Sequence, residues 1–456
     1  MSKNKHILKL FSSFGKNGGL LPSILYLSLS LSIYAQSSVS VIAPQQEHDT
    51  DNGTYNSFVR INESFSTYLL AYTGYGGQAG YLKTFKLSKD GTTITPLKLN
   101  GNDDFNYDSK RGVFNSVVQL TSDIFVLAYS GTGSHGFIKT FKIDADGKAV
   151  TLKGTKKHDD KHNAYNSLIK LDDNTVILAY YGEGGTGSRG GYVKAFDITT
   201  DGAITETAVQ RFTAGTSNYN KVAKVDNNTV VVVSQRSGAW IETLDLAADG
   251  KSFAEVQEKQ FDSNRGLHLD LIAGESGKFI AAYDGYDKGI TNQNGGMIST
   301  FSITNQGAIT YEAKLKHTTY YNTQWNSLVK VSTDVYALVH RDNANRGTIK
   351  TFYIPADAKL ISEVTSERFY NSNNSHNFLT KIDSDTYVNL WAGNGNNGFI
   401  GTFTINSDRP YFKSVKLASD NKSITIETNE PIYTSTGATT SPVKEDFIFS
   451  YSRNSD

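Results

Sequence analysis

Histidines collect in one kind of segment along this 456-residue chain. Nine His occur, and the eight that follow residue 36 lie in or beside polar stretches between short apolar runs. Six lie in stretches that connect one repeated unit to the next, and two lie in or beside a loop within a unit: His48, His158, His162, His268, His317 and His376, then His135 and His340. His readily gains or loses a proton near neutral pH and is a common metal ligand, so chemistry is expected in these stretches first.

Four residues of these stretches could together support proton abstraction from a sugar: His268, Tyr283, His340 and Arg341. A His or Tyr can act as the general base, and an Arg can neutralise the carboxylate of a uronate sugar. A polysaccharide lyase, or another carbohydrate-active enzyme, needs such a set. No motif of the chain matches such an enzyme residue by residue, so enzymatic activity is the alternative interpretation.

Seven further residues could bind a ligand without converting it. They lie where a unit departs from the consensus of the other units, which often marks a functional position because local folding rules are overridden there. An aromatic face can stack on a pyranose ring, while Arg and Asp bind hydroxyl or carboxylate groups. The candidates are Arg236, Trp240, Arg265, Asp284, Asp287, Asp342 and Trp391. The alternative is that they are ordinary solvated loop residues, since loops favour such side chains.

One short stretch has the composition of a metal site. His158, Asp160 and His162 stand at alternate positions, and imidazole with carboxylate is a ligand set for divalent cations. A solvated loop has the same composition. We therefore expect no cofactor, with a divalent cation at this stretch as the one exception to test.

The elements that must position these residues recur along the chain. Apolar runs at Leu168–Leu171, Val176–Tyr180 and Tyr192–Ile198 are separated by Asp, Asn and Gly. Short runs of this composition between turn residues predict antiparallel strands. An Asn opens the first run of most units, at intervals of about 48–59 residues, with His268 near the equivalent place in a fifth, degenerate unit: Asn56, Asn115, Asn166, Asn220, Asn326 and Asn377.

Four strands in each of seven units predict an all-β fold, a seven-bladed β-propeller of four-stranded antiparallel blades. The seventh unit ends at Ile405 after three strands, and Ser38–His48 resembles a fourth strand. We expect Ser38–Pro44 to pair with Gly398–Ile405, because an N-terminal strand there would close the ring and remove both free edges. In such a ring, the connections between units share one face with the loops between second and third strands. The repeated Asn is expected to hydrogen-bond between blades, and the recurrent Lys of the third strand to be structural or solvated: Lys83, Lys139, Lys194 and Lys350.

The two ends of the chain differ from the repeat. Residues 1–36 combine four Lys, an apolar run at Leu20–Ile33 and a small Ala35, which indicates a secretory signal peptide; a short membrane anchor is the alternative. Residues 37–409 would then be the propeller. Residues 410–456 would begin an Ig-like β-sandwich and leave it incomplete, since such a domain needs about 100 residues.

Composition narrows the classes of partner. The chain has no Cys, so an exported form must be held by its core without disulfides. Removing four Lys with the leader from 45 basic residues, against 45 acidic ones, leaves a net charge of about −4. No basic stripe is visible, so nucleic acid is not an expected partner. No second long apolar stretch follows the leader, so we expect a secreted or outer-surface protein with no membrane span in the mature chain.

The units resemble the tandem seven-bladed propeller repeats of large secreted bacterial surface proteins. The resemblance is carried by YNSLIKL, VILAYYGEG and GYVKAF within residues 165–196 and by their copies. The tail SVKLASDNKSITIETNEPIY is similar to the opening of the bacterial Ig-like modules that follow such propellers, and the leader ending IYAQ resembles those of Bacteroidetes-type bacteria. The expected function is a cell-surface binding or adhesion module for a glycan or protein, which the neutral charge, the many Tyr and the tandem modular architecture favour. A structural spacer remains a further alternative, because a propeller hosts many functions.

Overall fold

The computed structural model describes residues 39–406, except residues 44, 76, 186, 287–292 and 319–322, together with five short strands nearer the chain ends. The chain divides into two compact units, one formed by Ser38–Asn406 and the other by Met1–Ser37 with Ser407–Asp456. All candidate site residues named above belong to the first unit.

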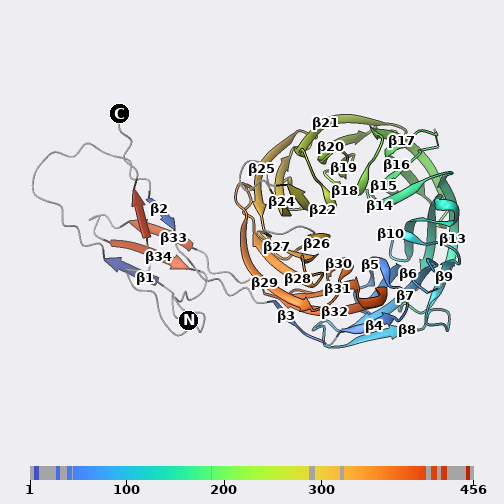
Figure 1. The fold of residues 1–456 in the computed structure, drawn as a ribbon, viewed down its shortest axis with the longest axis horizontal. Helices are drawn as coiled ribbons and strands as arrows, with labels where there is room; N and C mark the ends of the chain where they lie inside the picture. Colours follow the sequence, from blue (N-terminus) through green and yellow to red (C-terminus); the bar gives the residue numbers. More distant parts are fainter. Residues whose placement is uncertain are drawn as a thin grey trace, which may run out of the picture. The chain divides into compact units, whose positions relative to one another are not determined.

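The first unit is a ring of seven antiparallel sheets, a β-propeller (Figure 1). In six of the sheets, or blades, the strands follow one another in chain order from the axis outward. The prediction of an all-β, seven-bladed propeller is therefore confirmed. The helical elements among the described residues are two single 3-10 turns, η1 (Thr132–Ser134) and η2 (Asn394–Asn396).

The strands of the blades have the following bounds. Blade 1 contains β5 (Thr54–Asn62), β6 (Thr67–Thr73), β7 (Gly80–Leu87), β8 (Ile94–Leu97) and β9 (Phe105–Asp108); blade 2 contains β10 (Val113–Gln119), β11 (Ile124–Ser130), β12 (Gly136–Ile143) and β13 (Val150–Asp159); blade 3 contains β14 (Asn163–Lys170), β15 (Thr175–Gly182), β16 (Gly190–Ile198) and β17 (Ile204–Ala214). Blade 4 contains β18 (Asn218–Lys224), β19 (Thr229–Gln235), β20 (Ala239–Leu246) and β21 (Phe253–Asp262); blade 5 contains β22 (Leu267–Ala273), β23 (Lys278–Tyr286), β24 (Asn294–Ile303) and β25 (Ile309–Lys316). Blade 6 contains β26 (Gln324–Lys330), β27 (Val335–Arg341), β28 (Gly347–Tyr353) and β29 (Ser362–Tyr370); blade 7 contains β30 (Ser375–Lys381), β31 (Thr386–Ala392) and β32 (Gly398–Ile405).

Blade 7 is completed by the N-terminal part of the propeller. Strand β3 (Val39–Val41) pairs antiparallel with β32, so that Val39 lies opposite Ile405. Strand β4 (Gln46–Asp49) pairs with the other end of β32. The predicted closure is confirmed, and it takes two short strands where one was expected. The outer strand of blade 1 is divided in the same way, into β8 and β9.

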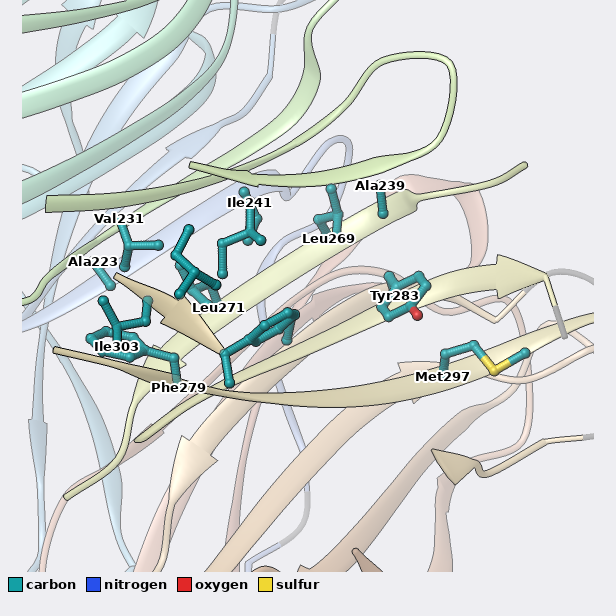
Figure 2. Close-up of a cluster of buried hydrophobic side chains, with 14 residues drawn as sticks. Ala223, Val231, Ala239, Ile241, Leu269, Leu271, Phe279, Tyr283, Met297 and Ile303 are labelled. Carbon is teal, nitrogen blue, oxygen red and sulfur yellow. The ribbon is translucent and has the colours of Figure 1, made fainter. Parts of the chain in front are cut away.

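The core lies between blades, because each middle strand is buried on both faces. Successive side chains of a strand point to opposite faces, and β19 shows the consequence. Val231 and Val233 pack with Leu269, Leu271 and Phe279 of blade 5, the cluster drawn in Figure 2. Their neighbours Val230 and Val232 belong to the cluster shared with blade 3. Because both faces of β19 are apolar, this strand packs blade 4 against both of its neighbours.

A hydrogen bond from a third-strand Thr repeats at five blade interfaces on the outer part of the ring. Thr84 of β7 donates its hydroxyl to the carbonyl oxygen of Gly147, in the third-to-fourth-strand turn of blade 2, at 2.7 Å. Thr402 of β32 makes the equivalent bond to Gly91 of blade 1, also at 2.7 Å. Gly91 and Gly147 have φ near +72°, a region that glycine enters without a steric penalty. The Asp-Gly turns seen in the sequence thus serve contacts between blades.

The second unit contains two small sheets. Strands β33 (Phe412–Leu417) and β34 (Ser423–Thr428) form a hairpin, and β1 (Lys5–Lys9) pairs with β34. Strand β2 (Leu27–Ser30) pairs with β35 (Ile448–Tyr451). The tail therefore contains strands at Phe412–Leu417, Ser423–Thr428 and Ile448–Tyr451. Within the residues that the structure describes, no helix has the length and apolarity to cross a bilayer.

Candidate functional site: an aromatic well on the propeller axis

Seven aromatic side chains form a closed circle around the propeller axis, one from the first strand of each blade. Each touches the next, with ring centroids 3.8–4.8 Å apart, and the last touches the first. We call this set the aromatic ring: Tyr55, Phe114, Tyr165, Tyr219, His268, Trp325 and His376. Each member directly precedes the repeated Asn, except His268, which precedes Leu269. The sequence comparison thus aligned His268 one position early.

A β-bulge turns each of these residues toward the axis. The pairing of first and second strands shifts register at the same place in every blade, for example between Ala164 and Ser167 in blade 3. The ring residue inside the bulge has positive φ in all seven blades, such as 54° for Tyr165. That backbone region costs a residue other than glycine about 1 kcal/mol or more. Bulges re-aim side chains, and here the same strained turn is repeated seven times to line one axis.

The repeated Asn holds the bulge of the preceding blade. The side-chain amide of Asn115 donates to the carbonyl oxygen of Tyr55, at 3.2 Å, and to that of Gly112, at 3.1 Å. Asn326 and Asn377 donate in the same way to the carbonyls of His268 and Trp325. The predicted role of the Asn, a hydrogen bond between blades, is confirmed. The amide nitrogens that carry these bonds are thereby committed to the fold.

The aromatic ring surrounds a cavity of about 130 Å³. An engineered cavity of about 150 Å³ holds one benzene molecule, so the well has room for a single six-membered ring. Besides the aromatic side chains, its lining consists of the six Asn, Leu269 and Lys221. Lys221 is the charged group of this lining, and it lies 3.1 Å from the carboxylate of Asp270.

Both imidazoles of the ring are neutral at pH 7. Burial lowers the pKa of His268 to about 3, with a smaller contribution from Arg341. Burial also lowers the pKa of His376 to about 3, with help from His268 and Arg341. Nδ1 of His268 and Nε2 of His376 are buried and have no hydrogen-bond partner among the described residues. Both nitrogens belong to residues that line the well.

Next to the aromatic ring, on the side of the loops, the polar side chains differ from blade to blade. At this level Arg265 makes two hydrogen bonds to the carboxylate of Asp284, at 2.9 and 2.7 Å. Arg341 lies opposite Gln324 in the strand register and donates to its side-chain oxygen. Every blade therefore contributes an aromatic side chain to the ring, while the residues on the loop side of the ring differ between blades.

The loops around this level form one face, as predicted. The carboxylate of Asp159, after β13, accepts hydrogen bonds from the backbone of His162 and also from Glu183 and Gly184 in the loop after β15. Asp262 joins the equivalent segments of blades 4 and 5, since its carboxylate accepts hydrogen bonds from the backbone of Asn264 and of Tyr286. Asp159 and Asp262 on this face therefore cap turns with their carboxylates.

The four catalytic candidates do not come together. His268 is a member of the aromatic ring, and Arg341 lies beside it on the loop side. Tyr283 is fully buried between blades, with its hydroxyl 3.1 Å from the Ser299 hydroxyl. His340 is buried against His317. Two of the four therefore belong to the axial site, and two belong to blade interfaces.

The ligand-binding candidates divide in a similar way. Arg236 lies over the Trp240 ring and forms ion pairs with Glu242, at 2.6 Å, and Glu258, at 3.0 Å. Glu242 occupies the third-strand position that is Lys in four other blades. In blade 4 the acid therefore lies on the third strand, and Arg236 supplies the positive charge of the ion pair. Trp391 is buried beside Phe369 and Phe399.

The remaining binding candidates are bound to partners on the loop face. Asp284 pairs with Arg265, as described above. Asp342 is hydrogen-bonded and ion-paired to Arg346 within one loop. Asp287 lies outside the described residues.

The proposed metal ligands point to different neighbours. His158 packs edge-on against Tyr180, Asp160 is exposed and pairs with Lys157 at 2.9 Å, and His162 packs on Tyr181. In the part of the chain that the structure describes, the group of three candidate ligand atoms within 4.8 Å of one another is Glu242, Glu255 and Glu258. Arg236 already pairs with two of these carboxylates.

Contacts between blades account for four of the eight histidines after residue 36: His48, His158, His317 and His340. The last aromatic residue of one blade packs against an aromatic of the next blade's second strand, at centroid distances of 4.9–5.2 Å: His48–Tyr72, Tyr107–Tyr129, His158–Tyr180, Phe261–Tyr283, His317–His340 and Phe369–Trp391. His occupies positions where Phe or Tyr serves equally well. The position of these histidines therefore reflects aromatic packing between blades.

The sequence reasoning missed five members of the aromatic ring: Tyr55, Phe114, Tyr165, Tyr219 and Trp325. Their signal was an aromatic residue directly before each repeated Asn. Because the residue type changes among Tyr, Phe, Trp and His, this position was less visible than the constant Asn beside it.

The fold and the axial well define this protein as a seven-bladed β-propeller. Among solved structures, it is similar to a putative 6-phosphogluconolactonase from Bacteroides fragilis, with 14% identity and a TM-score of 0.54 over 79% of this chain and 93% of that one. It is also similar to a protein from Lactobacillus plantarum, with 15% identity and a TM-score of 0.50 over 69% and 84% of the two chains. At these identities the likeness shows the fold alone. No protein-family model and no curated protein sequence matches the chain.

Proposed function

We propose that the protein is a binding module whose ligand enters the aromatic well, and that the ligand is a glycan. The carrying observation is the closed circle of seven aromatic side chains around a cavity that fits one ring. Aromatic faces stack well on the C–H face of a pyranose, and the amphipathic edges of Tyr, Trp and His suit its hydroxyls. Strain repeated seven times to line one cavity supports a use for that cavity.

Nδ1 of His268 and Nε2 of His376, which have no hydrogen-bond partner among the described residues, suit the recognition of a sugar hydroxyl. A neutral imidazole nitrogen can donate or accept a hydrogen bond, depending on its tautomer. A buried polar atom without a partner costs about 1–3 kcal/mol, which a ligand hydroxyl could recover. These two residues flank Trp325, so the polar positions lie on either side of the largest stacking surface of the well.

A polysaccharide lyase is the second candidate, because His268 lies within the electrostatic influence of Arg341. A pKa of about 3 makes His268 a weak base at neutral pH, however, and Tyr283 and His340 are buried elsewhere. Binding without conversion is therefore the better-supported function. We also propose an extracellular or outer-surface location, supported by the leader-like composition of residues 1–36, and adhesion as the biological use.

The experiment is a binding screen with the full chain. Melting curves are recorded with neutral and acidic polysaccharides and with divalent cations, because a ligand that binds only the folded state raises the melting temperature. We expect a shift with a polysaccharide that disappears in Trp325→Ala. No shift with any polysaccharide contradicts the proposal. Appearance of unsaturated uronate in a shifted sample identifies a lyase instead.

A further inference from the structure

We propose that the aromatic well receives the terminal ring of an acidic glycan, and that Arg341 binds the carboxylate of that ring. The inference rests on the proposed function and specifies its ligand. It is carried by the size of the well, by the unpaired charge of Arg341 and by the lack of carboxylates in the described lining.

The charge of Arg341 is unpaired among the described residues. Its guanidinium donates to the neutral side chain of Gln324, and its Nε is buried without a hydrogen-bond partner. The other cations near the well have acids: Arg265 has Asp284, and Lys221 has Asp270. A partly buried guanidinium without an anion is costly, and a carboxylate is the group that its fork of donors fits best.

Arg341 is not among the residues that line the well, but the strand register places it beside a neighbour of Trp325. It lies opposite Gln324 in the strand register, and Gln324 directly precedes Trp325 of the aromatic ring. Its charge lowers the pKa of both His268 and His376, the two ring neighbours of Trp325. A sugar ring stacked on Trp325 would therefore present its exocyclic carboxylate to this side of the well.

A cationic ligand fits the same evidence less well. An aromatic cage can bind a quaternary ammonium group through cation–π contacts. Such a cage gains from a nearby carboxylate, whereas the lining holds none, and the unpaired charge of Arg341 repels a cation. The charge around the well therefore selects an anion.

The size of the well selects the end of a chain. A cavity of about 130 Å³ holds one six-membered ring and excludes two rings in line. The aromatic side chains surround the cavity on its sides, so a ligand that enters along the axis presents its terminal unit. Internal units of a long polysaccharide would not reach Trp325.

The test compares sugars that differ only in the carboxylate. Full-length protein is titrated calorimetrically with methyl glucuronide and methyl glucoside, then with methyl galacturonide and methyl galactoside. We expect the uronide of at least one pair to bind about 10- to 100-fold more tightly than its neutral partner, since a charge-assisted hydrogen bond contributes about 1.5–3 kcal/mol. Arg341→Gln should remove this preference, and Arg341→Lys should restore part of it. Arg368→Gln, which removes an exposed charge from β29 of the same blade, should leave it unchanged.

The outcomes separate the two proposals. Equal binding of uronide and neutral sugar overturns the inference and leaves the glycan-binding function standing. Binding of choline in place of either sugar overturns the inference in favour of a cation. Retention of the uronide preference in Arg341→Gln removes the assignment of this residue. No binding of any of these sugars, in a protein that also fails to bind polysaccharides, overturns the proposed function together with the inference.

Discussion

Trp325 lies against His376 with their ring centroids 3.8 Å apart and their planes inclined by 31°, the tightest contact in the aromatic ring. The two residues come from neighbouring blades, and each sits in a bulge with positive φ. The amide of Asn377 ties them together, since it follows His376 and donates to the carbonyl of Trp325 at 3.1 Å. The well is thus built from the same contacts that join the blades, so a preformed site comes with the closed ring.

Loss of one inter-blade amide should destabilise the propeller. Asn115→Ala leaves the carbonyls of Tyr55 and Gly112 and the hydroxyl of Tyr107 without their partner. We expect the free energy of unfolding to fall by about 2–3 kcal/mol, the penalty for buried polar groups left unpaired. Chemical denaturation measures this change. Asn174→Ala, in an exposed turn, is the control and should stay within about 0.5 kcal/mol of the parent; an equal effect of both substitutions would contradict the assigned role.

The strained backbone of the aromatic ring should show itself in a glycine–alanine comparison. At Phe114, where φ is 56°, we expect Phe114→Gly to be as stable as Phe114→Ala or more stable, by up to about 1 kcal/mol. At Val117, three residues further along β10, the order should reverse, because glycine weakens an ordinary strand position by about 0.5–1 kcal/mol. Denaturant midpoints of the four variants give both differences. Alanine above glycine at both positions would show that the positive φ carries no strain.

Ring closure should depend on residues 39–49. Deleting residues 37–48 removes both strands that pair with β32 and exposes its edge, so cooperative unfolding should be lost. The matched control is a permuted chain in which residues 39–52 follow residue 406, which restores the same pairing from the other end. We expect the permuted chain to regain a single sharp transition. An unchanged melting temperature in the deletion variant would refute closure by this segment.

Buried His48 should make the propeller sensitive to acid. Burial lowers the pKa of its imidazole from 6.5 to about 3, so the folded state takes up a proton later than the unfolded state does. The stability that depends on neutral His48 is therefore complete above pH 6.5 and is lost as the pH falls from 6.5 toward 3, by up to about 1.4 kcal/mol per pH unit. His48→Phe, which copies Phe261 of the equivalent position, should reduce the slope of stability against pH in this window.

The reciprocal variant supplies the control for this prediction. Phe261→His places an imidazole in the equivalent pocket of blade 4 and should steepen the acid loss over the same window. Denaturation midpoints between pH 4 and pH 7 measure both slopes. Slopes that stay unchanged in both variants would show that these positions do not hold a neutral imidazole.

The architecture was readable from the sequence because it is carried by constant residues. The Asn of six first strands, the Thr of six third strands and the Asp-Gly turns make the same bonds in several blades, as Asn115, Thr84 and Gly147 show. Identical chemistry in each copy leaves an identical residue. The closing strand was readable for a complementary reason, since the last unit lacked the strand that Val39–Val41 supplies.

The site was less readable because packing and chemistry use the same residue types. His158 was a candidate ligand in the sequence, yet it fills the place that Phe261 fills elsewhere, where only ring shape and burial are required. Conversely, Tyr165 and Trp325 looked ordinary because nothing in a linear pattern reveals a bulge that turns seven side chains to one axis. Arg341 was singled out by its departure from consensus, and its neighbour Gln324 was not.

The most direct test of the account is the fluorescence of Trp325. The chain has three Trp, and the other two can be replaced by residues that equivalent blades already use, as Trp240→Phe and Trp391→Tyr. In that variant all tryptophan emission comes from the aromatic well. We predict a saturable change in emission on titration with methyl glucuronide or methyl galacturonide, with the midpoint that calorimetry gives for the parent chain. Binding seen by calorimetry with constant Trp325 emission would place the ligand elsewhere and contradict the assignment of the axial well.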